Sequence, residues 1–183
     1  LNIVNEMSVT KSLASILTPP LNPVDSPTES DWRSVEGKLG FTLPQDYKDF
    51  VDIYGAGSVD GFLWVLNPIS KNPNLNLFDQ AKSRLDAQRR FSKDIRGITP
   101  YPLHPESNGL FPWGVTDNGD VLYWLCEGPA SAWRVVICDS RCSRWQILNA
   151  GFGEILMGIV IKELRIECFP GDFPSQLPDF VAV

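Results

Sequence analysis

The chain has 183 residues, of which 43% are hydrophobic and 21% charged, and these proportions are typical of a soluble globular protein. This length suits one domain with a core of its own. The formal net charge of −6 disfavours binding to the phosphate backbone of nucleic acids and favours a basic protein as partner.

The first 30 residues are predicted to form a short helix and a proline-rich connector. Apolar residues recur at helical spacing at Val9, Leu13, Ile16 and Leu17. Pro19 and Pro20 would end this helix, because proline lacks the amide proton that a helix interior needs. Residues 21–27 hold two more prolines and are expected to be extended.

Neither a secretory signal nor a membrane span is expected. Polar residues interrupt the apolar positions of residues 1–17, so we expect a cytoplasmic location. The longest apolar run, residues 155–161, is far shorter than the roughly 20 residues that cross a bilayer. We therefore expect no membrane partner.

Two amphipathic helices are predicted at residues 29–39 and 44–54. Their apolar positions at helical spacing are Trp32, Val35, Leu39, Leu43, Tyr47, Phe50, Val51 and Tyr54. A glycine follows each range, and the second range opens on a proline, as helix ends and starts favour. Thr28 and Asp31 resemble a capping box in which Asp replaces the usual Glu or Gln.

The middle of the chain alternates between regular elements and loops. Residues 62–66 are predicted to form a strand, and the Asn- and Pro-rich residues 67–76 a loop. Residues 77–91 carry apolar side chains among charged ones, which predicts a helix with one face on the sheet. A second loop with three prolines covers residues 99–108.

The strongest hairpin signal lies at residues 110–125. Two apolar runs, 110–116 and 121–125, flank the turn 117–120, which contains an Asn-Gly pair. Residues 134–139 and 145–148 give two further strands.

The C-terminal part is predicted to contain a helix at residues 154–165 and a tail at 167–183 with three prolines. Helices first, then strands, then a helix indicate an α+β domain. We expect a mostly antiparallel sheet of about five strands, flanked by N-terminal, middle and C-terminal helices.

Two motifs in a fixed order carry a family resemblance. The first runs from Trp32 to Gly55 and reads Trp-x-x-Val-Glu, Leu-Gly-x-x-Leu-Pro-x-Asp-Tyr and Tyr-Gly. The second holds Leu-Phe-Pro-Trp-Gly from Leu110, Asp-Asn-Gly-Asp from Asp117, and Trp-Arg-Val-Val from Trp133. Over roughly residues 32–164 the chain resembles the SUKH superfamily. That group includes the yeast cell-wall regulator-like proteins and many bacterial toxin-immunity proteins.

The resemblance implies a SUKH-like α+β domain at residues 31–166. It would be preceded by the helix and connector of residues 1–30 and followed by the tail of residues 167–183. Bacterial members look like immunity proteins, which bind a toxin made by the same cell and block its active site. A regulatory scaffold, as the eukaryotic relatives imply, is the alternative.

No catalytic constellation is recognisable. His104 is the single histidine and lies in a loop, and no Gly-x-Ser-x-Gly elbow is present. Gly55 and Gly57 follow a predicted helix and lack a third spaced glycine, so they do not indicate a nucleotide cradle. We therefore expect no enzymatic activity and no cofactor.

A metal site is not expected either. The four cysteines, at positions 126, 138, 142 and 168, lack the close pairs that structural zinc requires. The turn at Asp117 resembles the start of a calcium loop, but Gly128 stands where the twelfth-position Glu would be needed.

The expected partner is a basic toxin of the nuclease or deaminase type, bound by acidic and polar residues on loops. The candidate partner-binding residues are Asp117, Asn118, Asp120, Asp60, Glu106 and Glu127. Turns expose side chains at little cost to the fold, and carboxylates there could replace substrate phosphates. The alternative is that Asp117 and Asp120 only stabilise the turn.

Overall fold

The computed structural model describes residue 9 and residues 12–94 and 99–183. Of the predicted first helix, residues 12–14 are helical and Leu13 and Leu17 are buried, whereas residues 1–8, 10 and 11 lie outside the described part. Within that part, none of the helices combines the length and apolar content needed to cross a bilayer.

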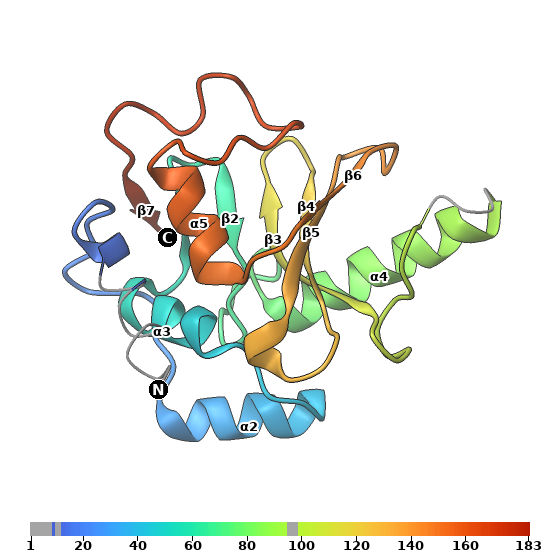
Figure 1. Cartoon of the computed structure of the whole chain (residues 1–183). Helices are drawn as coiled ribbons and strands as arrows, with labels where there is room; N and C mark the ends of the chain where they lie inside the picture. Colours follow the sequence, from blue (N-terminus) through green and yellow to red (C-terminus); the bar gives the residue numbers. More distant parts are fainter. Residues whose placement is uncertain (1–8, 10–11, 95–98) are drawn as a thin grey trace.

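One antiparallel sheet organises the fold, in the order β6-β5-β4-β3-β2-β1-β7 (Figure 1). The strands are β1 (Gly57–Val59), β2 (Leu63–Val65), β3 (Leu110–Thr116), β4 (Val121–Leu125), β5 (Arg134–Cys138), β6 (Trp145–Leu148) and β7 (Phe180–Ala182). The helices are α2 (Glu29–Leu39), α3 (Gln45–Tyr54), α4 (Leu77–Asp94) and α5 (Phe152–Val160), with a 3-10 turn at Ala130–Ala132. The α+β class predicted from the sequence is confirmed.

The two faces of the sheet have different covers. Helices α3 and α5 pack together on one face, and α4 lies against β3 on the other (Figure 1). On the α3 side, the Tyr47 ring meets Trp124 at 4.9 Å and Phe152 at 5.4 Å between centroids. The Tyr47 hydroxyl donates to the Leu66 carbonyl at 2.5 Å, which satisfies its buried polar atom.

The motif that carries the family resemblance joins α2 to α3. Thr28 and Asp31 form the predicted capping box, with Thr28 N donating to the Asp31 carboxylate at 2.8 Å. This hydrogen bonding lowers the pKa of Asp31. The motif's Glu36 carboxylate accepts from Leu43 N and from Lys48 Nζ, both at 2.9 Å. The Glu in this motif therefore fixes the α2–α3 connection.

The two glycines after α3 permit close backbone approach. Gly55 has φ 69°, and a Cβ there would lie 2.2 Å from the Val24 carbonyl oxygen. A Cβ on Gly57 would lie 2.4 Å from the Val181 carbonyl oxygen. These glycines therefore let the N-terminal connector and the last strand pack beside α3 and β1.

The sheet has seven strands, more than the five expected. The two unpredicted strands, β1 and β7, are three residues long and pair with each other antiparallel. All three residues of β1 are buried, so the alternation that marks a strand in sequence is absent there. Strands of three residues are too short to be stable alone, so each depends on the strands that pair with it.

The C-terminal helix is shorter than predicted, and residues 167–183 do more than form a tail. Helix α5 ends at Val160, and Lys162 follows with φ 63°, which breaks the helical path. The segment beyond residue 166 supplies β7 and the buried side chains of Phe169 and Phe180. It folds back along the end of the sheet, above α5 in Figure 1.

Candidate partner-binding surface

The predicted hairpin turn at Asp117 lies beside the β1–β2 turn at one end of the sheet. Asp117 N donates to the Phe62 carbonyl at 3.1 Å, and the Asp117 carboxylate accepts from Trp64 Nε1 at 2.9 Å. Asp117 and Asn118 are both exposed. The turn therefore presents a carboxylate and an amide from a backbone that two neighbouring strands hold in place.

Asp120 is only 2% exposed, so its side chain presents almost no surface to a partner. Its carboxylate accepts from Thr116 Oγ1 at 2.7 Å and from Ser140 N at 3.0 Å. These bonds tie the β3–β4 turn to the β5–β6 turn. Such bonds are those expected of an acid that stabilises its turn.

Asp60 is occupied in holding the C-terminal segment. Its carboxylate accepts from Ser175 N at 2.8 Å, Ser175 Oγ at 3.3 Å and Asp179 N at 2.8 Å. Asp60 is partly exposed, with φ 52°, a value that Asp tolerates better than most residues. Asp60 therefore anchors the C-terminal segment beside Asp117 and Asn118, and both of its carboxylate oxygens already accept hydrogen bonds.

Glu106 and Glu127 lie at the opposite end of the β3–β4 hairpin. Glu106 is exposed in the loop before β3, and Glu127 pairs with Arg134 at 2.6 Å just after β4. The seven residues of β3 span roughly 20 Å at about 3.4 Å per residue. The structure therefore brings Asp60, Asp117 and Asn118 together and separates them from Glu106 and Glu127.

The C-terminal loop, residues 161–179, completes this end of the molecule. Phe62 in the β1–β2 turn packs against Phe169 and Phe173, with ring centroids at 5.4 Å and 4.6 Å. Sequence reasoning missed both phenylalanines because the prolines around them indicated a tail. Two large rings so close in a proline-rich stretch were the available signal, since such rings need a surface to cover.

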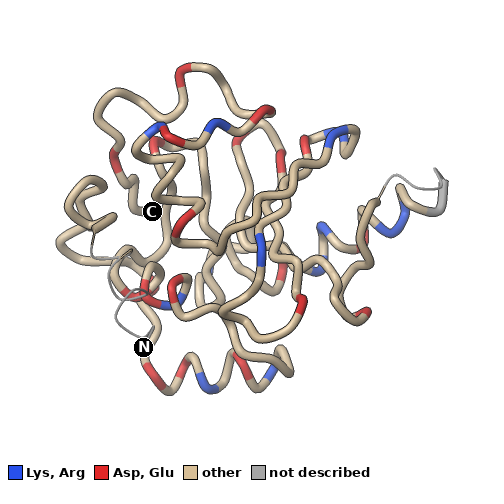
Figure 2. The backbone as a smooth tube through the Cα atoms, in the orientation of Figure 1, with Lys and Arg blue, Asp and Glu red and all other residues tan. Residues whose placement is uncertain are grey.

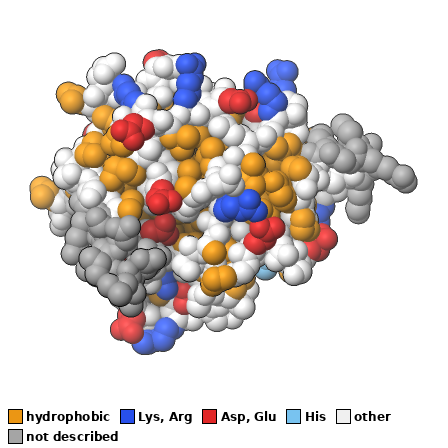
Figure 3. All heavy atoms as spheres, in the orientation of Figure 1, with side chains coloured by type: hydrophobic (Ala, Val, Ile, Leu, Met, Phe, Trp, Pro, Cys, Tyr) orange, Lys and Arg blue, Asp and Glu red, His pale blue; other side chains and the backbone are white. Residues whose placement is uncertain are grey.

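Charges of both signs mark this end. Figure 2 shows acidic and basic residues following one another along the C-terminal loop. Exposed acids and bases include Lys162, Glu163, Arg165, Glu167 and Asp172. Figure 3 shows hydrophobic groups between them on the face that carries α5. The surface is therefore mixed, and the acidic excess of the chain is not concentrated here.

Two of the cysteines, Cys126 and Cys168, and the single histidine occupy sites unlike those of reactive groups. Burial raises the pKa of the Cys126 thiol to about 12 and that of Cys168 to about 11. His104 stacks edge-on against Phe41 and Phe111, and burial lowers its pKa. Among the residues that the structure describes, His, Cys, Asp and Glu form no cluster of three suited to a metal ion.

Comparison with known protein families shows to which superfamily the chain belongs. The SUKH_6 family model, described as SMI1-KNR4 cell-wall, matches residues 29–154. The chain belongs to the SUKH superfamily. The matched SUKH region begins at α2 and ends within α5, so it includes the Asp117 turn but not the C-terminal loop. No curated protein sequence matches the chain.

Proposed function

We propose that this protein is an immunity protein that binds a cognate bacterial toxin and covers its active site. The observation that carries the proposal is membership of a superfamily that includes toxin-immunity proteins. The exposed pair Asp117 and Asn118, on a turn fixed by Trp64 and Phe62, supports it as a rigid contact point.

Inhibition would be steric and electrostatic, without chemistry by this chain. A net charge of −6 complements the basic groove of a nuclease or nucleic-acid deaminase. Attraction of this kind speeds encounter and weakens as salt rises. The proposal places the protein in the cytoplasm, where it would meet the toxin before export.

Capture from the native host tests the partner. Immobilised protein should retain a polypeptide with a basic toxin domain, and co-expression should restore growth to cells that make this domain. Asn118→Arg adds positive charge at the proposed contact without removing a hydrogen bond of the described residues. It should slow association at low salt. Ser107→Arg, in the exposed loop at the other end of β3, is the matched control.

The regulatory scaffold remains a second candidate because the matching family is described by its cell-wall members. The same capture separates the two functions. A scaffold would retain intracellular regulatory proteins and give no protection against a toxin domain. Equal association rates for the Asn118→Arg and Ser107→Arg variants would show that the toxin does not contact the Asp117 turn.

A further inference from the structure

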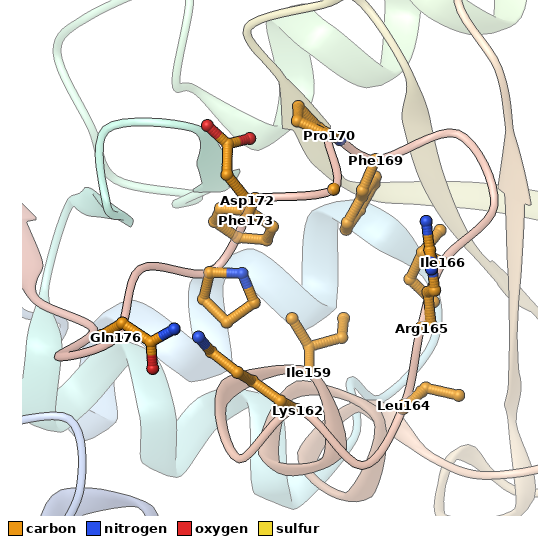
Figure 4. Close-up of a pocket in the computed structure, with 12 residues that line it drawn as sticks. Ile159, Lys162, Leu164, Arg165, Ile166, Phe169, Pro170, Asp172, Phe173 and Gln176 are labelled. Carbon is orange, nitrogen blue, oxygen red and sulfur yellow. The ribbon is translucent and has the colours of Figure 1, made fainter.

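A cavity of about 330 Å³ lies between the end of α5 and the C-terminal loop (Figure 4). Its apolar lining includes Ile159, Ile166, Phe169, Phe173 and Pro174. Ligand pockets in proteins run from about 300 to 1,000 Å³, so this one suits a small molecule. All the residues that line it lie beyond the region that the SUKH family model matches.

Two cations border this apolar space. Figure 4 shows Lys162 and Arg165 on opposite sides of the cavity. Neither forms an ion pair with a carboxylate of the described residues. Asp172 also lines the cavity, but its carboxylate points away from Ile159 in Figure 4. The site therefore combines aromatic walls with positive charge that the fold leaves unpaired.

The backbone of Lys162 adds an independent observation. It has φ 63° at the position after the helix cap, where glycine or asparagine is usual. A lysine there is strained, because its Cβ crowds the carbonyl in the left-handed region. Residues with a strained backbone are more frequent at functional sites, where the role of the side chain outweighs the energetic cost of the strain.

We propose that this cavity binds a small carboxylate that carries an apolar ring or chain. The apolar part packs against Phe169 and Phe173, and the carboxylate lies beside Lys162, while Arg165 adds positive charge from the other side of the cavity. The carboxylate supplies the negative charge that both cations lack, and the rings remove the apolar part from water. This binding is separate from toxin binding and does not depend on it.

Calorimetry with three matched probes tests the proposal. The probes are 4-phenylbutanoate, the neutral 4-phenylbutan-1-ol and the cationic 4-phenylbutylamine. The carboxylate should bind with a 1:1 stoichiometry and at least about tenfold more tightly than the alcohol, since a charge-assisted hydrogen bond contributes this much. The amine should bind more weakly than the alcohol.

Lys162→Gly is the decisive variant, because it removes the charge and also relieves the left-handed strain. It should melt at the same temperature as the parent or higher, yet bind the carboxylate about tenfold more weakly. Arg165→Gln should also weaken binding, by a smaller factor, because its charge acts from the other side of the cavity. Lys71→Gln, an exposed lysine in the loop before α4, is the matched control and should leave the affinity unchanged.

Three results would overturn the proposal. The first is no saturable binding of the carboxylate up to about 10 mM. The second is an alcohol or amine affinity equal to that of the carboxylate. The third is an equal loss for Lys71→Gln and Lys162→Gly. None of these results bears on toxin capture, so this proposal and the proposed function fail separately.

Discussion

Tyr47 in α3 contributes to the core through both its ring and its hydroxyl. It is fully buried, packs edge-on against three aromatic rings, and donates its hydroxyl proton to Leu66 of the strand-to-loop junction. Burial raises the pKa of this phenol well above its usual range, so it stays protonated. The ring and the hydroxyl therefore do separate things, packing the core and satisfying a carbonyl.

Tyr47→Phe should isolate the hydroxyl's contribution, because the ring stays. The Leu66 carbonyl loses its donor in a buried site, and we expect a loss of about 1–3 kcal/mol in the free energy of unfolding. Urea denaturation measures it. Tyr101→Phe is the control, since Tyr101 is partly exposed and its hydroxyl forms no hydrogen bond with the residues that the structure describes. Equal effects of the two variants would show that the Leu66 bond contributes nothing.

His104 should make stability depend on pH. Its pKa in the folded protein is lowered from 6.5 by burial and then by the nearby Arg89 charge. Well above pH 6.5 the imidazole is neutral in both the folded and the unfolded chain, and it does not affect stability. As pH falls through 6.5, the unfolded chain takes up a proton that the folded chain resists, so stability falls. Thermal melts of the parent and of His104→Gln at pH 7.5 and 5 should show a smaller drop for the variant. Parallel drops would contradict this assignment.

At the residue scale, the sequence predicted the candidate site only in part. Asp117 and Asn118 are exposed in their turn, as an Asp-Asn-Gly-Asp hairpin suggests. Asp120 is the same residue type three positions after Asp117, yet it is buried, and its carboxylate accepts from Ser140 N of a distant turn. That partner lies 20 positions along the chain, and no local pattern could identify it.

At the scale of elements, local signals succeeded where the chain itself decides the structure. The predicted range of α2 and the strands of the Asp117 hairpin match the structure to the residue, because capping and turn residues mark their ends. Strands β1 and β7 were missed because each has only three residues and depends on pairing with neighbouring strands. The end of α5 was missed because Lys162 takes a conformation usual for glycine.

The start of α5 depends on a residue of another helix. Its cap position, Gly151, has no side chain, and the Asp46 carboxylate of α3 accepts from Gly153 N at 2.7 Å instead. Asp46→Ala should therefore cost about 0.5–2 kcal/mol in the free energy of unfolding, the usual value of a lost cap. Urea denaturation measures this, with Asp49→Ala, one turn further along α3, as control. An Asp46→Ala loss no larger than the control's would show that α5 needs no cap from α3.

At the scale of the whole molecule, the first described segment and the last one both bond to the chain that leads into β1. Residues 55–59 stand between them, with the Ala56 amide bonded to Val24 and its carbonyl to Val183. Tyr54 connects to both, since its hydroxyl donates to the Leu17 carbonyl at 2.6 Å and its ring packs against Phe180 at 5.0 Å. The SUKH region is therefore completed by chain outside the part that the family model matches.

The packing of the last segment beside β1 predicts that β7 is needed for a stable fold. Phe180 is 6% exposed and also contacts Phe50 at 6.0 Å, whereas Val181, the next residue, points outward and is 42% exposed. Phe180→Ala should therefore cost about 3–5 kcal/mol in the free energy of unfolding, and Val181→Ala should change it by less than about 0.5 kcal/mol. Chemical denaturation of both variants measures the difference. If Phe180→Ala and Val181→Ala unfolded at the same urea concentration as the parent, residues 167–183 would be dispensable. The hydrogen bonds of Asp60 to Ser175 and Asp179 would then hold a segment that the fold does not need.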